Sequence, residues 1–406
     1  MSHSTSSTDT APPVQSQRAS RVKMRELIFV SLENWDEVWR RNQPICAALV
    51  RRFPDIKILF VGLPRNVSHD LRHGSLRALR TRATWTVPDY PNITVTRALK
   101  LCPDSIPTGR RFNEAMTRRH VSRIARGLGF TDPLLWLNPH SAVHMAGAMN
   151  EKAVIYDITD DWAMAPSFSE RDRKLIVAQD RALCLRADLT VVCSDVLEKS
   201  RQGRCKDLLL VQNGVECEHY AAIPDKTQPG PWPGPVLGYT GTIHGDRFDV
   251  DLVAGLAAAF SRGSIVLVGP DHLTKSEKEK LAPHSNIHIT GPVAYARIAE
   301  VMAQFDICIV PHVENKFTNS LNPLKLWEYL AAGKPIVSTN VSGFSSYPQF
   351  CRIASGTDPF IQACHEALAE DGTLRSDRRA EALKHSWDQR VELLIERLSE
   401  KGLINE

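Results

Sequence analysis

The sequence predicts an α/β protein with two doubly wound parallel sheets, one in each of two domains that face a cleft. At 406 residues the chain is too long for one ordinary hydrophobic core, which favours two domains. Short apolar runs recur along the chain and rarely alternate with polar residues, which is typical of strands buried on both faces. Helical stretches separate these runs, which indicates β-α-β units.

The predicted strands follow one another from the N-terminus to the C-terminus of the chain. They are Leu27–Ser31, Ile56–Val61, Leu134–Leu137, Ala153–Tyr156, Leu189–Cys193, Leu208–Val211, Val236–Thr240, Ile265–Val268, Ile287–Ile289, Ile307–Val310 and Ile336–Ser338. A run rich in Pro and Gly at 224–235 cannot continue a helix or a sheet, because Pro lacks the amide donor and has a fixed φ. We therefore expect a disordered tail over 1–23, an N-terminal domain over 24–223, a linker over 224–235 and a C-terminal domain over 236–384. A C-terminal helix is expected over 385–406.

The composition excludes several classes of protein. A net charge of +4 gives no reason to expect nucleic acid as a partner. Nine cysteines, an odd number with no C-x-x-C pair, indicate a reducing compartment without a disulfide framework or a zinc site. No apolar run has the roughly 18–20 residues needed to span a bilayer, and the tail lacks the apolar stretch of a secretory signal. We expect a cytoplasmic protein.

Positive charge is concentrated between Arg65 and Arg126, which contain thirteen Lys and Arg but four Asp and Glu, a local net charge of +9. The segment 110–126 has the pattern of a basic amphipathic helix with Phe112, Met116, Val121 and Ile124 on its apolar face. Such helices bind anionic membranes or lipid-linked diphosphates, so peripheral contact with the inner face of the cell membrane is one interpretation. A solvated basic face is the other.

Two segments of the C-terminal domain have features of a phosphate site. The strand at Val236–Thr240 leads into a loop where the backbone of Gly241 and Thr242 can surround a phosphate and Arg247 can add charge, although ordinary turns share this pattern. A short helix is expected between Pro323 and Gly333.

That helix carries Lys325 and Glu328 at i, i+3, on one face. The carboxylate can hold two ribose hydroxyls, and the positive end of the helix can face a diphosphate. An exposed amphipathic helix with a Lys–Glu pair is the alternative.

Several motifs together resemble a known family. They are Trp35–Gln43, Tyr156–Trp162, Val211-Gln-Asn-Gly-Val215, the loop at 238–249, and the run Asn322–Pro335. The chain resembles glycosyltransferases of the group 1 (family 4) type, and most closely the branch that acts in teichuronic acid and exopolysaccharide synthesis.

The resemblance implies the GT-B fold, with two Rossmann-like domains, and a nucleoside-diphosphate sugar as donor, with UDP or GDP as the nucleotide and no metal cofactor. It implies that the C-terminal domain binds the donor through Gly241, Thr242, Arg247, Asn322, Pro323, Leu324, Lys325 and Glu328. Two departures bear on the transferred sugar: Ser320 stands where the family has the first of two glutamates eight positions apart, of which Glu328 matches the second, and no lysine follows Arg247 in 248–255.

Three carboxylates follow the predicted strand Ala153–Tyr156. We expect Asp160 to be the general base, with Asp157 as second choice, while Asp161 contacts the acceptor; capping of the next segment is the alternative. If the enzyme retains configuration, the leaving phosphate takes the proton and these residues orient the acceptor.

Other residues of this half are expected beside the acceptor. We predict a helix over Trp35–Gln43 that brings Arg40 and Arg41 to the cleft, and we expect His140 there too. His140 and His144 have a spacing that suits zinc, but no third ligand follows, so no metal site is predicted.

The predicted function is transfer of a sugar to a hydroxyl group of a glycan or a lipid-linked saccharide in cell-surface polysaccharide synthesis. Two alternatives remain open at this level. A nucleotide-sugar epimerase of the same fold would release an epimerised sugar without an acceptor, and a non-catalytic scaffold would not respond to any nucleotide sugar.

Overall fold

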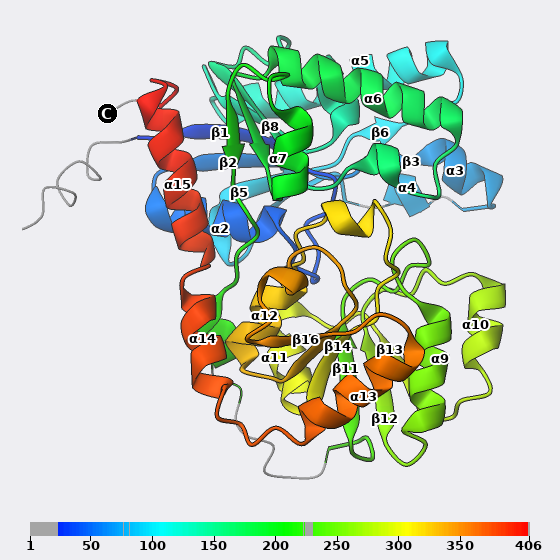
Figure 1. Ribbon diagram of the computed structural model, residues 1–406. Helices are drawn as coiled ribbons and strands as arrows, with labels where there is room; N and C mark the ends of the chain where they lie inside the picture. The colour runs from blue at the N-terminus through cyan, green and yellow to red at the C-terminus, as the bar shows by residue number, and fades with distance from the viewer. Residues whose placement is uncertain (1–22, 76, 81, 222, 224–229, 405–406) are drawn as a thin grey trace, which may run out of the picture.

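The computed structural model describes residues 23–75, 77–80, 82–221, 223 and 230–404 (Figure 1). The tail expected over 1–23 therefore lies outside the described residues except for Lys23, and so does the first half of the linker expected over 224–235.

The first sheet has eight strands in the order β10-β9-β8-β7-β1-β2-β5-β4. Its strands are β1 (Glu26–Val30), β2 (Lys57–Val61), β4 (Thr84–Val87), β5 (Tyr90–Thr96), β7 (Leu134–Leu137), β8 (Ala153–Ile158), β9 (Leu189–Val192) and β10 (Leu208–Leu210). All neighbours run parallel except β4, which is antiparallel to β5. A separate parallel pair joins β3 (Arg65–Asn66) to β6 (Leu99–Lys100).

The second sheet has six parallel strands in the order β13-β12-β11-β14-β15-β16. Its strands are β11 (Val236–Thr240), β12 (Ser264–Val268), β13 (Ile287–Gly291), β14 (Ile307–Val310), β15 (Ile336–Ser338) and β16 (Cys351–Ile353). The carboxyl ends of parallel strands in a doubly wound sheet are where ligands bind, so the loops after these strands are the first place to look for a site.

Helices cover both sheets (Figure 1). They are α2 (Asn42–Arg52), α3 (Val67–Arg72), α4 (Arg77–Arg80), α5 (Pro107–Gly127), α6 (Glu170–Arg186), α7 (Asp195–Arg201), α8 (Cys217–Ala221), α9 (Val250–Ala259), α10 (Lys275–Leu281), α11 (Tyr295–Ala303), α12 (Leu324–Ala332), α13 (Thr357–Leu368), α14 (Arg375–Leu383) and α15 (Trp387–Glu400). Short 3-10 turns occur at η1 (His140–His144), η2 (Trp162–Met164), η3 (Thr318–Ser320) and η4 (Phe344–Ser346).

The predicted strands all appear, within one residue of their expected ends, except that β8 and β13 each run on for two residues, to Ile158 and Gly291. The strands that were not predicted are β3, β6, β16 and the edge pair β4–β5. Residues of β4 and β5 alternate between polar and apolar types, and only Val87, Ile93, Val95 and Thr96 among them are buried, so these strands lack the continuous apolar run of a central strand.

The helix predicted over Trp35–Gln43 is wrong. Residues 35–40 form an irregular loop, and α2 begins only at Asn42, with Pro44 in the first turn where a missing amide donor costs least. The buried Gln43 holds the loop in place, since its side-chain amide donates to the carbonyls of Asn34 and Val38 at 3.1 and 3.3 Å. The loop therefore reaches toward the second sheet, and the amide of Tyr295 donates to the Glu37 carbonyl at 2.7 Å.

The C-terminal helix α15 returns to the first sheet (Figure 1). Trp387, Val391 and Leu394 are buried in the same hydrophobic cluster as Phe29 of β1. The helix is capped by Ser386, whose hydroxyl accepts from the Gln389 amide. α15 follows the strands of the second sheet in the chain, but it buries its apolar face on the first sheet. The chain therefore crosses between the two halves a second time just before α15.

Candidate active site

A cavity of about 520 Å³ lies between the two sheets, at the loops that follow their strands. The first half of the chain contributes Leu32, Glu33, Val38, Trp39, Arg40, Arg41, Asn42, Asn138, His140, Thr159, Asp160, Trp162, Phe168, Asn213 and Tyr220. The second half contributes Thr240, Gly241, Thr242, Arg247, Val268, Gly269, Pro270, Val293, Tyr295, Ile298, His312, Leu321, Asn322, Pro323, Leu324, Lys325 and Glu328. All eight residues expected to bind the donor line this cavity, whereas Asp157 and Asp161 do not.

Cations gather on one side of the cavity. Gly241 has φ +138°, and a Cβ at this position would lie 2.4 Å from Nζ of Lys325, so only glycine allows the lysine to lie against this loop. Burial lowers the pKa of Lys325 to about 8, with Glu328 opposing the shift and the nearby charges of Arg247 and Arg40 adding to it. Three positive side chains close together, two of them from the second half of the chain, form a site for a polyanion.

The Arg247 guanidinium has a donor that is available to a ligand. It lies over the Phe317 ring, 5.5 Å from the centroid. Its Nε is buried and has no hydrogen-bond partner within the described residues. A buried N–H without a partner costs free energy in the empty protein, and a bound anion would remove that cost.

Helix α12 begins at Leu324, directly after Pro323, and ends at Ala332, with Gly333 as the C-cap residue at φ +69°. The helix is fixed to the loop after β11, because the Tyr329 hydroxyl accepts from the Thr240 amide at 2.9 Å. Glu328 faces the cavity beside Tyr220, and burial raises the pKa of its carboxyl while Lys325 opposes the shift.

A polar network joins the two halves of the chain beneath the cavity. The Asn213 amide donates to Oδ1 of Asn322 at 2.8 Å, and Arg41 Nη1 donates to Oδ1 of Asn213 at 2.9 Å. The Ser194 hydroxyl donates to the Ser320 carbonyl at 2.7 Å. Arg41 is only 4% exposed, so it serves mainly to connect these groups, although part of it lines the cavity.

Asp157 has a different place from the one expected of a base. Its carboxylate is fully buried and accepts from Nε and Nη2 of Arg41 at 3.1 and 3.0 Å. Both oxygens are therefore occupied, and Asp157 is not among the residues that line the cavity. We replace its expected role as second-choice base with a role in holding Arg41.

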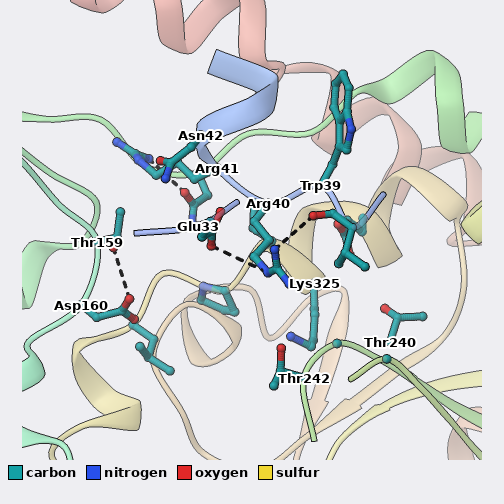
Figure 2. Close-up of a pocket in the computed structure, with 18 of the residues that line it drawn as sticks. Glu33, Trp39, Arg40, Arg41, Asn42, Thr159, Asp160, Thr240, Thr242 and Lys325 are labelled. Atoms are coloured by element: carbon teal, nitrogen blue, oxygen red, sulfur yellow. Dashed lines mark hydrogen bonds and ion pairs between the residues drawn. The ribbon is translucent and has the colours of Figure 1, made fainter. Parts of the chain in front are cut away.

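Asp160 lies at the cavity, where its Oδ2 accepts from the Thr159 hydroxyl at 3.2 Å (Figure 2). Burial raises its pKa, while Arg247 opposes the shift from across the cleft, as do Thr159 and Arg41. Asp161 instead points toward Arg201, 3.4 Å from Nη1.

Glu33 is a cavity residue that the motifs did not indicate. One carboxylate oxygen lies 3.7 Å from Nε of Arg40, and the other is buried without a hydrogen-bond partner in the described part of the chain (Figure 2). Burial raises its pKa to about 7; Arg40 opposes the shift, and the negative charge of Asp160 adds to it. The signal that could have revealed Glu33 is its position just after β1, at the carboxyl end of a central strand.

His140 and His144 do not share a face, although their i, i+4 spacing would place them on one face of an α-helix. They lie in η1, a 3-10 turn with about three residues per turn, so i and i+4 point in different directions. His140 lines the cavity, while burial lowers the pKa of His144 to about 4. Within the described ranges, no three His, Cys, Asp or Glu side chains come together in a way that could hold a metal ion.

Comparisons with known proteins place this geometry in context. Residues 234–370 match the family of group 1 glycosyl transferases. A Bacillus subtilis protein named as a teichuronic acid biosynthesis glycosyltransferase, TuaH, is 32% identical over 255 residues, 58% of this chain. The chain spans 64% of the length of that relative.

Solved structures resemble nearly the whole chain. Sucrose-phosphate synthase of Thermosynechococcus elongatus has a TM-score of 0.69 at 14% identity, over 93% of this chain and 99% of that one. HepE of Anabaena, in complex with UDP and glucose, has a TM-score of 0.64 at 14% identity, over 93% of this chain and 100% of that one. These similarities confirm the expected GT-B fold.

Proposed function

We propose, from the GT-B fold and from the match of residues 234–370 to the group 1 glycosyl transferases, that this protein transfers a sugar from a nucleoside-diphosphate sugar to a hydroxyl acceptor. One observation carries the proposal. A single cavity brings Lys325, Arg247 and Glu328 from the second half of the chain opposite Asp160 and Glu33 from the first. Anion-binding groups therefore face carboxylates across a space of about 520 Å³.

The donor nucleotide occupies the side of the cavity that belongs to the second sheet. Glu328 accepts hydrogen bonds from the ribose hydroxyls, while Lys325, Arg247 and the backbone of Gly241 and Thr242 surround the diphosphate. The start of α12 at Leu324 adds the positive end of a helix. The donor nucleotide is UDP or GDP, and uridine nucleotides come first for testing because HepE, of similar fold, was solved with UDP.

The reaction breaks the bond between the anomeric carbon and the diphosphate oxygen and forms one between that carbon and the acceptor oxygen. The acceptor loses its hydroxyl proton to Asp160 if the configuration inverts, and to the leaving phosphate if it is retained. Because its pKa is raised, the Asp160 carboxylate is a stronger base than that of an ordinary aspartate. Lys325 and Arg247 stabilise the negative charge that grows on the leaving diphosphate.

Glu33 takes over part of the binding of the transferred sugar. Ser320, where the family has a glutamate, is buried, and its hydroxyl donates to the Phe317 carbonyl at 2.7 Å. It therefore offers no carboxylate to the sugar. Glu33 has a carboxylate oxygen without a partner among the described residues and lies across the same cavity, so we assign it contacts with the sugar hydroxyls.

The acceptor is a glycan or a lipid-linked saccharide of a cell-surface polymer, in keeping with the teichuronic acid synthesis for which the Bacillus relative is named. The basic region supports a peripheral position at the inner face of the membrane, because exposed apolar side chains lie among its arginines. These side chains, all between Arg65 and Arg126, are Leu71, Leu79, Leu101, Ile106 and Phe112. Among the described residues, no helix is both long enough and apolar enough to cross a bilayer.

The test has two stages. Thermal unfolding is followed with UDP-, GDP-, ADP- and dTDP-sugars, since a ligand that binds only the folded state raises the melting temperature. The sugar that binds is then incubated with and without glycoside acceptors, and the anomeric proton of the product is read by NMR. Release of an epimerised sugar without an acceptor would establish the epimerase instead, and no response to any nucleotide would favour the scaffold.

A further inference from the structure

We propose that a second cavity, which opens from the cleft at Asp160, binds the acceptor sugar and selects an uncharged or amino sugar over an anionic one. This inference rests on the proposed function. The cavity has a volume of about 270 Å³. It shares Asn138, His140, Thr159, Asp160 and Trp162 with the larger cavity, so the two spaces meet at the carboxylate that we assign as the base.

All residues that line the second cavity come from the first half of the chain, between positions 138 and 204. None of the residues assigned to the donor is among them. A molecule in this space therefore reaches Asp160 without contacting the residues assigned to the nucleotide, so one of its hydroxyls can lie beside the base and face the larger cavity. This is the position that the nucleophile of a glycosyl transfer requires.

The charges of this cavity disfavour an anion. Arg201 is nearly buried and lies between two carboxylates, 3.1 Å from Asp180 and 3.4 Å from Asp161. Asp180 also accepts from the Tyr156 hydroxyl at 2.8 Å. The positive charge of Arg201 is thus neutralised within the protein.

The remaining charged groups at this cavity are Asp160 and Arg204, which is exposed. Burial lowers the pKa of His140, although the charge of Asp180 opposes the shift, so the ring is neutral at pH 7. The lining has three aspartates against two arginines, a net charge of −1 with His140 neutral, so a carboxylate or phosphate on the acceptor would be repelled, whereas sugar hydroxyls and ammonium groups are donors that aspartates accept.

Trp162 gives the cavity an aromatic surface of the kind that packs against the apolar face of a sugar ring. Its indole Nε1–H is buried and has no hydrogen-bond partner within the described chain. The Trp162 ring packs against the rings of Phe168 and Phe317, with centroid distances of 6.3 and 6.0 Å. Phe317 also lies under Arg247, so one aromatic side chain supports both the predicted diphosphate site and the predicted acceptor site.

The mouth of the cavity offers a place for a variant that does not disturb this packing. Val177 on α6 lines the cavity and is 53% exposed. Val177→Trp would fill the entrance without removing a core contact. Asp180→Asn would keep a hydrogen-bond acceptor for Tyr156 and remove one negative charge. Glu170→Gln on the same helix, where Glu170 is exposed, is the matched control for loss of an acid.

The full-length protein is assayed with the nucleotide sugar that raises its melting temperature and with two acceptors that differ only at C6, p-nitrophenyl β-D-glucoside and p-nitrophenyl β-D-glucuronide. We expect kcat/KM to favour the glucoside at least roughly tenfold, since one unscreened charge pair in a partly buried site is worth that much. Asp180→Asn should reduce the preference by about tenfold, and Glu170→Gln should not change it. Val177→Trp should raise the acceptor KM about tenfold and leave the donor KM unchanged.

Equal or better use of the glucuronide by the wild type would overturn the proposal, and so would an unchanged acceptor KM in Val177→Trp. Saturation-transfer NMR with methyl β-D-glucoside and methyl β-D-glucuronide gives a readout that needs no turnover. If the wild type binds the glucoside and Val177→Trp does not, the second cavity is supported, whether or not a nucleotide binds. Failure of every nucleotide to bind would refute the transfer reaction but not the cavity. Binding that Val177→Trp leaves intact would refute the cavity.

Discussion

Replacement of Asp157 by Asn should destabilise the protein, although Asp157 lies only three residues before the proposed base. The Asp157 carboxylate is 0% exposed and Arg41 is 4% exposed. Two hydrogen bonds of 3.0 and 3.1 Å join them. Asn offers a single oxygen and no charge, so the Arg41 guanidinium would remain buried without a counterion.

The expected magnitude follows from this burial. Removing one partner of a buried ion pair costs about 3–5 kcal/mol, because the other charge stays desolvated. That is a large share of the roughly 5–15 kcal/mol by which a folded domain is stable. At about 2–4 °C for each kcal/mol in a domain of this size, the melting temperature should fall by on the order of 10 °C.

Asp160→Asn should behave in the opposite way. Burial raises the pKa of Asp160, so its ionised form is a cost to the folded protein that Asn does not carry. The melting temperature should stay level or rise, while the transfer rate falls by roughly a hundredfold or more if Asp160 is the base. Scanning calorimetry and the transfer assay are applied to both variants, with exposed Asp55→Asn as the control for loss of an acid.

The assignment of the two carboxylates is refuted if Asp157→Asn unfolds within about 2 °C of the wild type, a shift worth at most 1 kcal/mol. It is equally refuted if Asp160→Asn keeps full activity on an acceptor that the wild type uses. A variant at position 157 that is stable but inactive would return Asp157 to the role of base.

Three further predictions concern the cleft. Gly241→Ala places a Cβ 2.3 Å from Cε of Lys325 and should weaken binding of the nucleotide sugar roughly tenfold in calorimetry, whereas Gly203→Ala, which has φ +72° and nothing within 4 Å, carries only the backbone strain and should bind normally. Glu328→Gln should weaken UDP-sugar binding but not the binding of inorganic diphosphate, which has no ribose; equal loss of both would contradict the assignment. Glu33 has a folded pKa of about 7 against an ordinary value of 4.5, so its neutral form stabilises the fold below pH 4.5 and this contribution, on the order of 3 kcal/mol, is lost as the pH rises through 7. The melting temperature of the wild type should therefore fall between pH 5 and pH 8 relative to Glu33→Gln, and parallel curves would show that Glu33 is not perturbed.

The sequence predicts the apolar strands well and the edge pair β4–β5 poorly, for a physical reason. In a strand such as β1, the stretch Leu27–Val30 is buried and must be apolar, and that run is visible without knowledge of its neighbours. The edge pair β4–β5 is half-buried and has mixed composition, so its strands depend on partners that the sequence does not reveal. The donor helix can also be predicted from local sequence, since its boundaries follow from Pro323 and Gly333.

The acceptor side depends on distances through space. The apolar run after Lys152 ends at Tyr156, but β8 continues to Ile158, so Asp157 is a strand residue paired with Val191 and buried by it. Three carboxylates that look equivalent in sequence are thereby divided between a strand and the loop after it. The role of Glu33 is still harder to predict from the sequence, because Asp160, whose charge acts on it, is more than a hundred residues away in the chain.

The same connections give the motif Val211–Val215 a role that joins both halves of the site. Asn213 accepts from Arg41 through its side chain, and its backbone amide donates to Asn322, just before the donor helix. A Cβ on Gly214 would lie 3.0 Å from the His385 carbonyl, so glycine is needed where the chain crosses back toward the first sheet. Loss of Asp157 would therefore loosen Arg41 and, through Asn213, the start of α12. The melting temperature and the donor KM should change together in Asp157→Asn, whereas in Asp160→Asn only kcat should fall, and this pairing distinguishes a positioning residue from one that moves a proton.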